Sequence, residues 1–161
     1  MLPLADTTSH TRRETGVAWL FVAVQFLLLG VMVLYPRDTA WAPSEIMQLI
    51  GSALMVAGVV VGLWAAAYLG KGLTPLPLPN GATDLVTRGP YRLVRHPIYV
   101  SVMLLGAGIT IRSGSAIVAL AFVALVALFA VKARWEEMHL IDAFPGYERY
   151  MEASGRFSPI P

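Results

Sequence analysis

Residues 85–99, LVTRGPYRLVRHPIY, decide how the rest of the chain must be arranged. Long apolar segments lie on both sides of this stretch, yet it carries four basic side chains: Arg88, Arg92, Arg95 and His96. Charge at or just below a membrane surface is costly unless it is paired or useful. Because Pro90 and Pro97 restrict the residue before them and suit the first turn of a helix, we expect an extended or turning strip and then a helix that begins near Pro97. The start of this helix would present His96 and Tyr99, and its free N–H groups would attract anions.

The composition indicates an integral membrane protein. Hydrophobic residues make up 57% of the 161 residues and charged residues 14%, a balance that a soluble domain of this size would not tolerate on its surface. The absence of cysteine excludes disulfides, thiolate nucleophiles and cysteine-based metal sites. The three histidines are scattered, and the basic residues flank apolar segments instead of forming a tract. We therefore expect neither a bound metal nor a nucleic-acid partner.

Four apolar segments predict membrane-embedded helices: residues 16–35, 45–69, 98–111 and 116–131. The first has 20 residues, and at about 1.5 Å rise per residue it can cross a hydrocarbon core of roughly 30 Å. Ser44 is the expected N-cap of the second. The third is short for a full crossing, so we expect it to tilt or to begin at the interface. A tight turn at residues 112–115 joins it to the fourth and predicts a helical hairpin.

The second segment and the residues after it carry two signals about packing. Small residues at three- to four-residue spacing predict close helix contact instead of ligand binding: Gly51, Ser52, Ala53, Gly58 and Gly62. The proline-rich segment, residues 70–80, cannot form a regular helix, because its alternating prolines remove N–H donors and favour an extended backbone. It is either a surface linker or, given its three apolar leucines, a wall of a cavity. The sequence leaves both alternatives open.

The basic residues predict the orientation of the chain. Ten of the twelve lysines and arginines fall on one side of a four-span topology, with Arg37 and Arg112 on the other. By the positive-inside rule, both termini and residues 85–99 then face the cytoplasm. This divides the chain into a polar cytoplasmic N-terminus (1–15), two transmembrane helices (16–69) and a region that carries the chemistry (70–161). That region ends in an amphipathic tail expected to lie on the lipid headgroups.

Two polar groups would meet at the open end of the predicted hairpin. The first contains Tyr91, Arg95, His96 and Tyr99, and the second contains Lys132, Arg134, Glu136 and Glu137. Together they would suit a zwitterionic ligand, with its carboxylate on His96 and the helix start and its amino or hydroxyl groups on Glu136. The alternative is that the arginines only enforce topology and that the glutamates form a solvated helix face with Lys132 and Arg134.

These residues carry a resemblance to a known family. Residues 85–99, followed after one hairpin by EEMHLIDAFPGYERY at 136–150, resemble the isoprenylcysteine carboxyl methyltransferase family and its bacterial phospholipid-methyltransferase-like relatives. The match extends over roughly residues 69 to 157. It implies an all-α integral membrane methyltransferase that uses S-adenosylmethionine in a cytoplasmic pocket. The glycine-rich fingerprint of soluble Rossmann-type enzymes is missing from the sequence.

The resemblance also implies roles for individual residues. It places ten residues against the cofactor: Thr83, Asp84, Leu85, Val86, Tyr91, His96, Pro97, Ile98, Tyr99 and Glu136. A substrate-side arginine of the family falls on Lys132, which with Glu136 is a candidate catalytic residue, and Arg134 is a second candidate for substrate binding. Lysine keeps the positive charge but lacks the planar fork that binds a carboxylate through two hydrogen bonds. A polar cofactor contact of the eukaryotic enzymes falls on Leu76.

The expected mechanism follows from a methyl donor that is already activated. Alignment of the acceptor and exclusion of water can then supply most of the rate, and an amine acceptor would also need a base, Glu136 or Glu137. We expect a lipophilic acceptor, such as an isoprenylcysteine carboxylate or another small lipid, that reaches the site from the bilayer. Two other classes stay open: an NADPH-dependent membrane reductase similar to the sterol reductases, and a non-enzymatic membrane scaffold.

Overall fold

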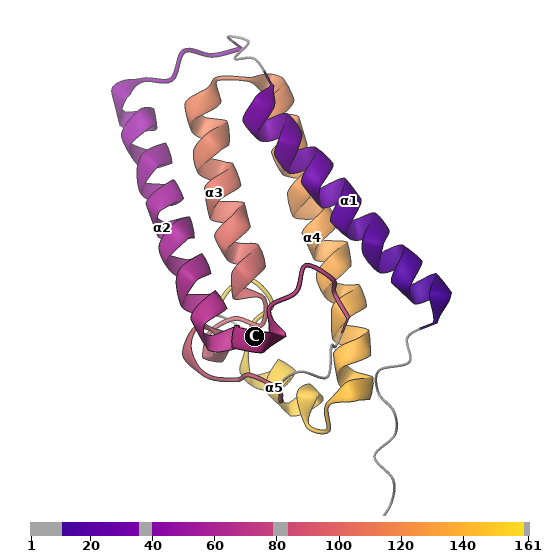
Figure 1. The fold of residues 1–161 in the computed structure, drawn as a ribbon. Helices are drawn as coiled ribbons and strands as arrows, with labels where there is room; N and C mark the ends of the chain where they lie inside the picture. Colours follow the sequence, from indigo (N-terminus) through magenta and orange to yellow (C-terminus); the bar gives the residue numbers. More distant parts are fainter. Residues whose placement is uncertain (1–10, 36–39, 79–83, 160–161) are drawn as a thin grey trace, which may run out of the picture.

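Four long helices make up most of the molecule (Figure 1). The computed structural model describes residues 11–35, 40–78 and 84–159. The long helices are α1 (Arg12–Leu34), α2 (Glu45–Leu69), α3 (Pro97–Ser113) and α4 (Ala116–Ala143), and a short α5 (Tyr147–Ala153) follows them. α1, α2 and α4 are long and apolar enough to cross a membrane, whereas α3 has only 17 residues. The predicted all-α integral membrane fold with four apolar helices is confirmed.

Polar side chains mark the starts of the long helices. Thr11 caps α1 in a capping box with Glu14, in which each side chain accepts a hydrogen bond from the backbone N–H of the other. Ser44 caps α2 as predicted by accepting from the N–H of Met47, and Ser115 caps α4. These caps satisfy N–H groups that would otherwise lack partners at the helix starts. The starts of these three helices therefore follow from local sequence.

Glycines allow α2 and α3 to pack closely, side by side (Figure 1). A Cβ added at Gly58 would lie 2.8 Å from the Leu105 side chain and 2.9 Å from the Ser101 carbonyl oxygen. The hydroxyl of Ser101 donates to the Gly58 carbonyl at 2.9 Å, a hydrogen bond between the two helices. At Gly51, an added Cβ would meet the side chain of Arg112. The small-residue pattern therefore serves helix packing at these positions, as predicted.

The other half of the bundle packs α1 and α3 on α4. A buried cluster joins α1 to α4, and side chains of α3 cover it. The members of the cluster are Met32 of α1 and Val118, Ala121, Leu125 and Phe129 of α4. Large apolar side chains on the outer faces of the spans are exposed, for example Leu63 on α2 and Leu120 on α4. Such outward apolar faces suit contact with lipid, because lipid tails are as apolar as these side chains. The interior side chains therefore hold the hairpin of α3 and α4 against α1.

The described segments between α2 and α3 and after α4 gather at one end of the bundle (Figure 1). The 3₁₀ turn η1 (Gly70–Gly72) leads into residues 73–78, which we call the connector, and a second turn, η2 (Gly89–Arg92), precedes α3. Gly89 has φ +60°, and a Cβ there would lie 2.8 Å from the ring of Tyr68 on α2. Only glycine combines this backbone with so close an approach. The expected turning strip and a helix beginning at Pro97 are both present.

The C-terminal tail packs into this end of the molecule. The N–H of Arg95 donates to the carbonyl of Gly155 at 2.9 Å, and the N–H of His96 donates to that of Arg156 at 3.2 Å. Tyr147 of α5 is 2% exposed. The tail was expected to lie on the headgroups, but one face of α5 and the strand-like residues after it are bound to the strip before α3. Its aromatic residues and Arg156 therefore have protein partners that the amphipathic pattern alone did not indicate.

Candidate functional site

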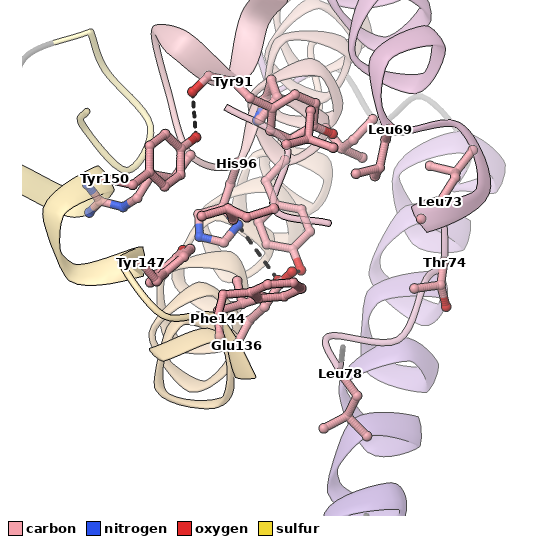
Figure 2. A pocket seen from close by; sticks show the side chains of 18 of the residues that line it. Leu69, Leu73, Thr74, Leu78, Tyr91, His96, Glu136, Phe144, Tyr147 and Tyr150 are labelled. Carbon is pink, nitrogen blue, oxygen red and sulfur yellow. Dashed lines mark hydrogen bonds and ion pairs between the residues drawn. The ribbon is translucent and has the colours of Figure 1, made fainter. Parts of the chain in front are cut away.

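A pocket lies where α3 begins and α4 approaches α5 (Figure 2). Its walls come from the end of α2, the connector, residues 84–86, the start of α3 and the region from α4 to α5. Nine of the ten residues that the resemblance assigns to a cofactor line it: Asp84, Leu85, Val86, Tyr91, His96, Pro97, Ile98, Tyr99 and Glu136. The tenth, Thr83, lies outside the described residues. The hairpin therefore brings the first polar group and Glu136 of the second to one pocket, and their role in binding a cofactor stays a prediction.

Glu136 supplies a carboxylate to the wall of this pocket. Its Oε2 accepts a hydrogen bond of 2.6 Å from the hydroxyl of Tyr99 and lies 3.7 Å from Nδ1 of His96. The Glu136 side chain is 24% exposed. It therefore keeps acceptor capacity for a ligand, because a carboxylate has about four lone-pair positions and Tyr99 uses one of them.

A stack of three rings holds Tyr99 in position. The Tyr99 ring is nearly parallel to those of His96 and Phe129, with ring centroids 5.2 Å and 4.7 Å away. Phe129 is fully buried in the core of α4. Parallel aromatic contacts at such distances are attractive. The hydroxyl that orients Glu136 is therefore carried by a ring fixed from both sides.

Glu137, the next residue, is almost fully buried and forms the centre of an ionic cluster. Its carboxylate accepts from Nε of Arg95 at 2.9 Å and from Nε of Arg156 at 3.0 Å, and its Oε1 lies 3.2 Å from Nε2 of His96. The side chain is 3% exposed. Because its oxygens are occupied by these partners, Glu137 suits a structural role: it ties α4 to the strip before α3 and to the tail. The sequence placed Glu137 in the polar group, but nothing in it indicated Arg156 as a partner.

Two tyrosines add hydroxyl groups to the pocket. Burial, and then the negative charge of Glu136, raises the pKa of Tyr91, and burial raises the pKa of Tyr150 to about 12. Both are therefore protonated at neutral pH. Tyr150 donates its hydrogen to the carbonyl of Tyr91 at 2.5 Å (Figure 2). The buried Tyr91 hydroxyl has no hydrogen-bond partner among the described residues, which leaves a donor at the pocket that a ligand would satisfy.

The two predicted substrate-side cations do not line the pocket. Arg134 is exposed on the outside of α4. Lys132 is 1% exposed, and its Nζ donates to Oε1 of Gln25 at 2.8 Å and to the carbonyl of Pro75 at 3.0 Å. It lies behind the ring of Tyr99, with Nζ 5.3 Å from the ring centroid. Neither cation therefore lines the pocket, and Lys132 contacts the described members of the predicted cofactor set only through the ring of Tyr99.

Some of the pocket wall was not assigned to a site from the sequence. The connector contributes Leu73, Thr74, Leu76 and Leu78. Of the two alternatives for the proline-rich segment, the structure therefore favours a cavity wall, and the alternation of leucine with proline was the signal. Phe144, Tyr147 and Tyr150 complete the wall from the tail. Their aromatic character was visible in the sequence, but their direction depends on how α5 folds back.

The lining has the chemistry to hold a ligand with both polar and apolar parts. Glu136 offers an acceptor, Tyr91 a donor, and α3 begins without a side-chain cap on its N–H groups. Leucines and aromatic rings cover the remaining wall and would suit a flat ring system. Within the described ranges, no group of histidine and carboxylate side chains is arranged to hold a metal ion. The pocket thus offers hydrogen bonds and apolar contact to an organic ligand.

Comparison with known proteins agrees with this arrangement. The family model described as phospholipid methyltransferase matches residues 46–146, from the start of α2 to the turn before α5. The chain is 32% identical to the cobalt-zinc-cadmium resistance protein CzcN of Cupriavidus metallidurans and 29% to the nickel-cobalt-cadmium resistance protein NccN of Alcaligenes xylosoxydans, in each case over 92% of the chain. It covers 65% and 66% of those proteins, slightly under two thirds. It is 31% identical to phosphatidylethanolamine N-methyltransferase B of Dictyostelium discoideum over 54% of the chain and 45% of that protein.

The matched region contains the long helices that build the pocket, but not α5, which supplies Tyr147 and Tyr150 to its wall. α2, α3 and α4 all fall within residues 46–146 apart from the first residue of α2, whereas α1 and α5 lie outside it. The match extends over more than half of the chain. The protein therefore belongs to the phospholipid methyltransferase family, which is also the family of the isoprenylcysteine carboxyl methyltransferase-like membrane enzymes that its sequence resembles.

Proposed function

We propose that the protein is an S-adenosylmethionine-dependent methyltransferase that acts on a lipophilic acceptor. The observation that carries the proposal is the shared pocket. Tyr91, His96 and Glu136, which come from opposite sides of the hairpin, line one hollow in the region that matches the family. A scaffold without a ligand would not need to bury a donor that has no partner among the described residues, as the Tyr91 hydroxyl is, since this costs roughly 1–3 kcal/mol.

The residues that line the pocket fit this cofactor. Glu136 would accept hydrogen bonds from amino or ribose hydroxyl groups. The Tyr91 hydroxyl and the uncapped start of α3 would receive the carboxylate. Leucines of the connector would cover the adenine ring. When bound, S-adenosylmethionine supplies an activated methyl group, so the chain has only to hold it, orient the acceptor and exclude water.

The charges around the pocket favour an amine over a carboxylate as the acceptor group. Arg95 lines the pocket but is bound to Glu137, and Lys132 is bound to neutral oxygens behind Tyr99. No cation is therefore free in the described lining to receive a carboxylate. Glu136 could take the proton that an ammonium group must lose before it accepts a methyl group. We propose a lipid amine as the acceptor, with the isoprenylcysteine carboxylate as the competing candidate.

We further propose that the pocket faces the cytoplasm, which the distribution of lysine and arginine supports. The cysteine-free sequence makes this testable. Single cysteines would replace Arg149, near the pocket, and Glu45, at the other end of α2. In intact cells, a membrane-impermeant thiol reagent should label the cysteine at position 45 but not the one at position 149. Labelling of the cysteine at position 149 but not of that at position 45 would contradict the proposed orientation.

Calorimetric titration of the detergent-solubilised chain tests the function directly. S-Adenosylhomocysteine should bind and NADPH should not. The reverse result would support the reductase, and binding of neither would support the scaffold. Incubation with methyl-labelled S-adenosylmethionine and either phosphatidylethanolamine vesicles or an isoprenylcysteine analogue then separates the acceptors by mass spectrometry.

A further inference from the structure

The polar side chain in the middle of α1 has a specific partner. Gln25 is the one amide in the apolar run 16–35, and an amide at such depth is costly unless it is hydrogen-bonded. Its Oε1 accepts a hydrogen bond of 2.8 Å from Nζ of Lys132. The two residues are 107 positions apart in the sequence. The pair therefore links the first helix to α4 at the level of the pocket.

Lys132 makes a second contact that reaches the wall of the pocket. Its Nζ donates to the carbonyl of Pro75 at 3.0 Å and lies 5.3 Å from the centroid of the Tyr99 ring. The ammonium group is thus surrounded by two neutral oxygens and an aromatic face, which replace part of its hydration. A lysine has three N–H donors, and two of them are used here.

Among the described residues, the connector has few other hydrogen-bond partners. Pro75 and Pro77 have no N–H, and the amide of Leu76 bonds only locally, to the hydroxyl of Thr74. Side chains on both sides of Pro75 line the pocket, namely those of Thr74 and Leu76. A displacement of the Pro75 carbonyl would therefore move the wall itself. The hydrogen bond from Lys132 fixes this wall at its middle.

We propose that Lys132 is a positioning residue that holds the connector against the cofactor pocket and is itself oriented by Gln25. In this arrangement α1, which lies outside the matched region, becomes a functional part of the site. The role differs from the acceptor binding that the resemblance assigned to this position. The effect on cofactor affinity rests on the proposed function, whereas the effect on the connector does not.

The test combines three substitutions and two measurements on the full chain in detergent, with the KM for the acceptor in a methyl-transfer assay as a third readout. Lys132→Met removes the charge and donors but keeps an unbranched apolar stem. Gln25→Leu removes the amide of α1 that accepts from Lys132 and leaves the contact of Lys132 with Pro75 in place. Hydrogen exchange followed by mass spectrometry reports on the connector, and calorimetry with S-adenosylhomocysteine reports on the pocket. Arg149→Met, which removes an exposed cation of α5, is the control for loss of one positive charge.

Lys132→Met and Gln25→Leu should both speed hydrogen exchange of the connector amides. They should also weaken S-adenosylhomocysteine binding, by roughly tenfold for Lys132→Met and by less for Gln25→Leu, because a hydrogen bond from a charged group is lost. The double variant should be little worse than Lys132→Met alone, because both changes remove the same link. Arg149→Met should match the wild type in both measurements.

Two results would overturn the proposal. One is unchanged exchange of the connector in Lys132→Met. The other is a Lys132→Met variant that raises only the KM for the acceptor while Gln25→Leu has no effect, which is the signature of direct acceptor binding. If Lys132→Met does not fold, Gln25→Leu decides alone through the same exchange measurement. If the wild type binds no S-adenosylhomocysteine, the proposed function fails, and the exchange measurement still decides whether Lys132 holds the connector.

Discussion

Two adjacent glutamates should respond in opposite ways to the loss of a charge. Glu136 faces the pocket and keeps free acceptor capacity, whereas Glu137 is 3% exposed and bound to two arginines. Glutamine has nearly the same shape as glutamate. Substitution to glutamine at each position therefore removes one negative charge from the same turn of α4, and each variant is the matched control for the other.

The structure sets the size of each effect. Glu137→Gln leaves Arg95 without its ionic partner in a buried place, which costs about 3–5 kcal/mol, while the Arg156 pair counts for less because that side chain is 29% exposed. Taking about 3 kcal/mol, the melting temperature should fall by roughly 6–12 °C at about 2–4 °C per kcal/mol. Glu136→Gln keeps an oxygen that can accept from Tyr99, so its melting temperature should change by no more than a few degrees.

Cofactor binding should show the reverse order. If Glu136 accepts hydrogen bonds from the cofactor, removing its charge should cost about 1.5–3 kcal/mol, or roughly ten- to hundredfold in Kd. The assay is thermal unfolding of the solubilised variants by fluorescence, followed by calorimetry with S-adenosylhomocysteine below the melting transition. A stable Glu137→Gln variant, or a Glu136→Gln variant with wild-type affinity, would refute the division of roles between the two carboxylates.

Three further predictions follow from the pocket and the packing of the helices. Tyr91→Phe should leave the melting temperature within about 1 °C of the wild type, because its hydroxyl has no hydrogen-bond partner among the described residues. It should weaken S-adenosylhomocysteine binding about fivefold or more in calorimetry, because the variant cannot donate to the ligand. Arg134→Met should leave both quantities unchanged, since its side chain is outside the pocket; weaker binding would restore the role that the resemblance assigned to it. Gly58→Ala should lower the melting temperature, because its methyl group would lie 2.8 Å from Leu105 and 2.9 Å from the Ser101 carbonyl. The free energy of unfolding should fall by about 1–3 kcal/mol. An unchanged melting curve would mean that α2 and α3 separate freely.

Local sequence was enough to predict the helices and the start of the site. α2 begins after Ser44 and α3 begins at Pro97, because a hydroxyl cap and a proline act within one turn of the residues they affect. Hydropathy over about twenty residues likewise predicts a span without reference to the rest of the chain. The predicted cofactor residues within 84–99 came from the family resemblance, and they line one pocket because most of them are close neighbours in the sequence.

Contacts between distant segments could not be predicted in this way. Hydropathy places Gln25 and Lys132 in apolar helices, but it does not say which faces of α1 and α4 meet. The pattern around Glu136 and Glu137 is also the same for both residues, and only the position of the folded tail leaves one at the pocket and buries the other with Arg156.

The sequence by itself therefore determined that this is a multi-span helical protein with a polar strip before its third helix, because capping, proline geometry and apolar length are local properties. The tertiary structure decided which of the neighbouring charged side chains face the pocket and which are bound behind it. The physical reason is that a buried charge takes its partner from whichever segment packs against it, and that segment lies 107 residues away for Lys132 and 19 residues away for Glu137.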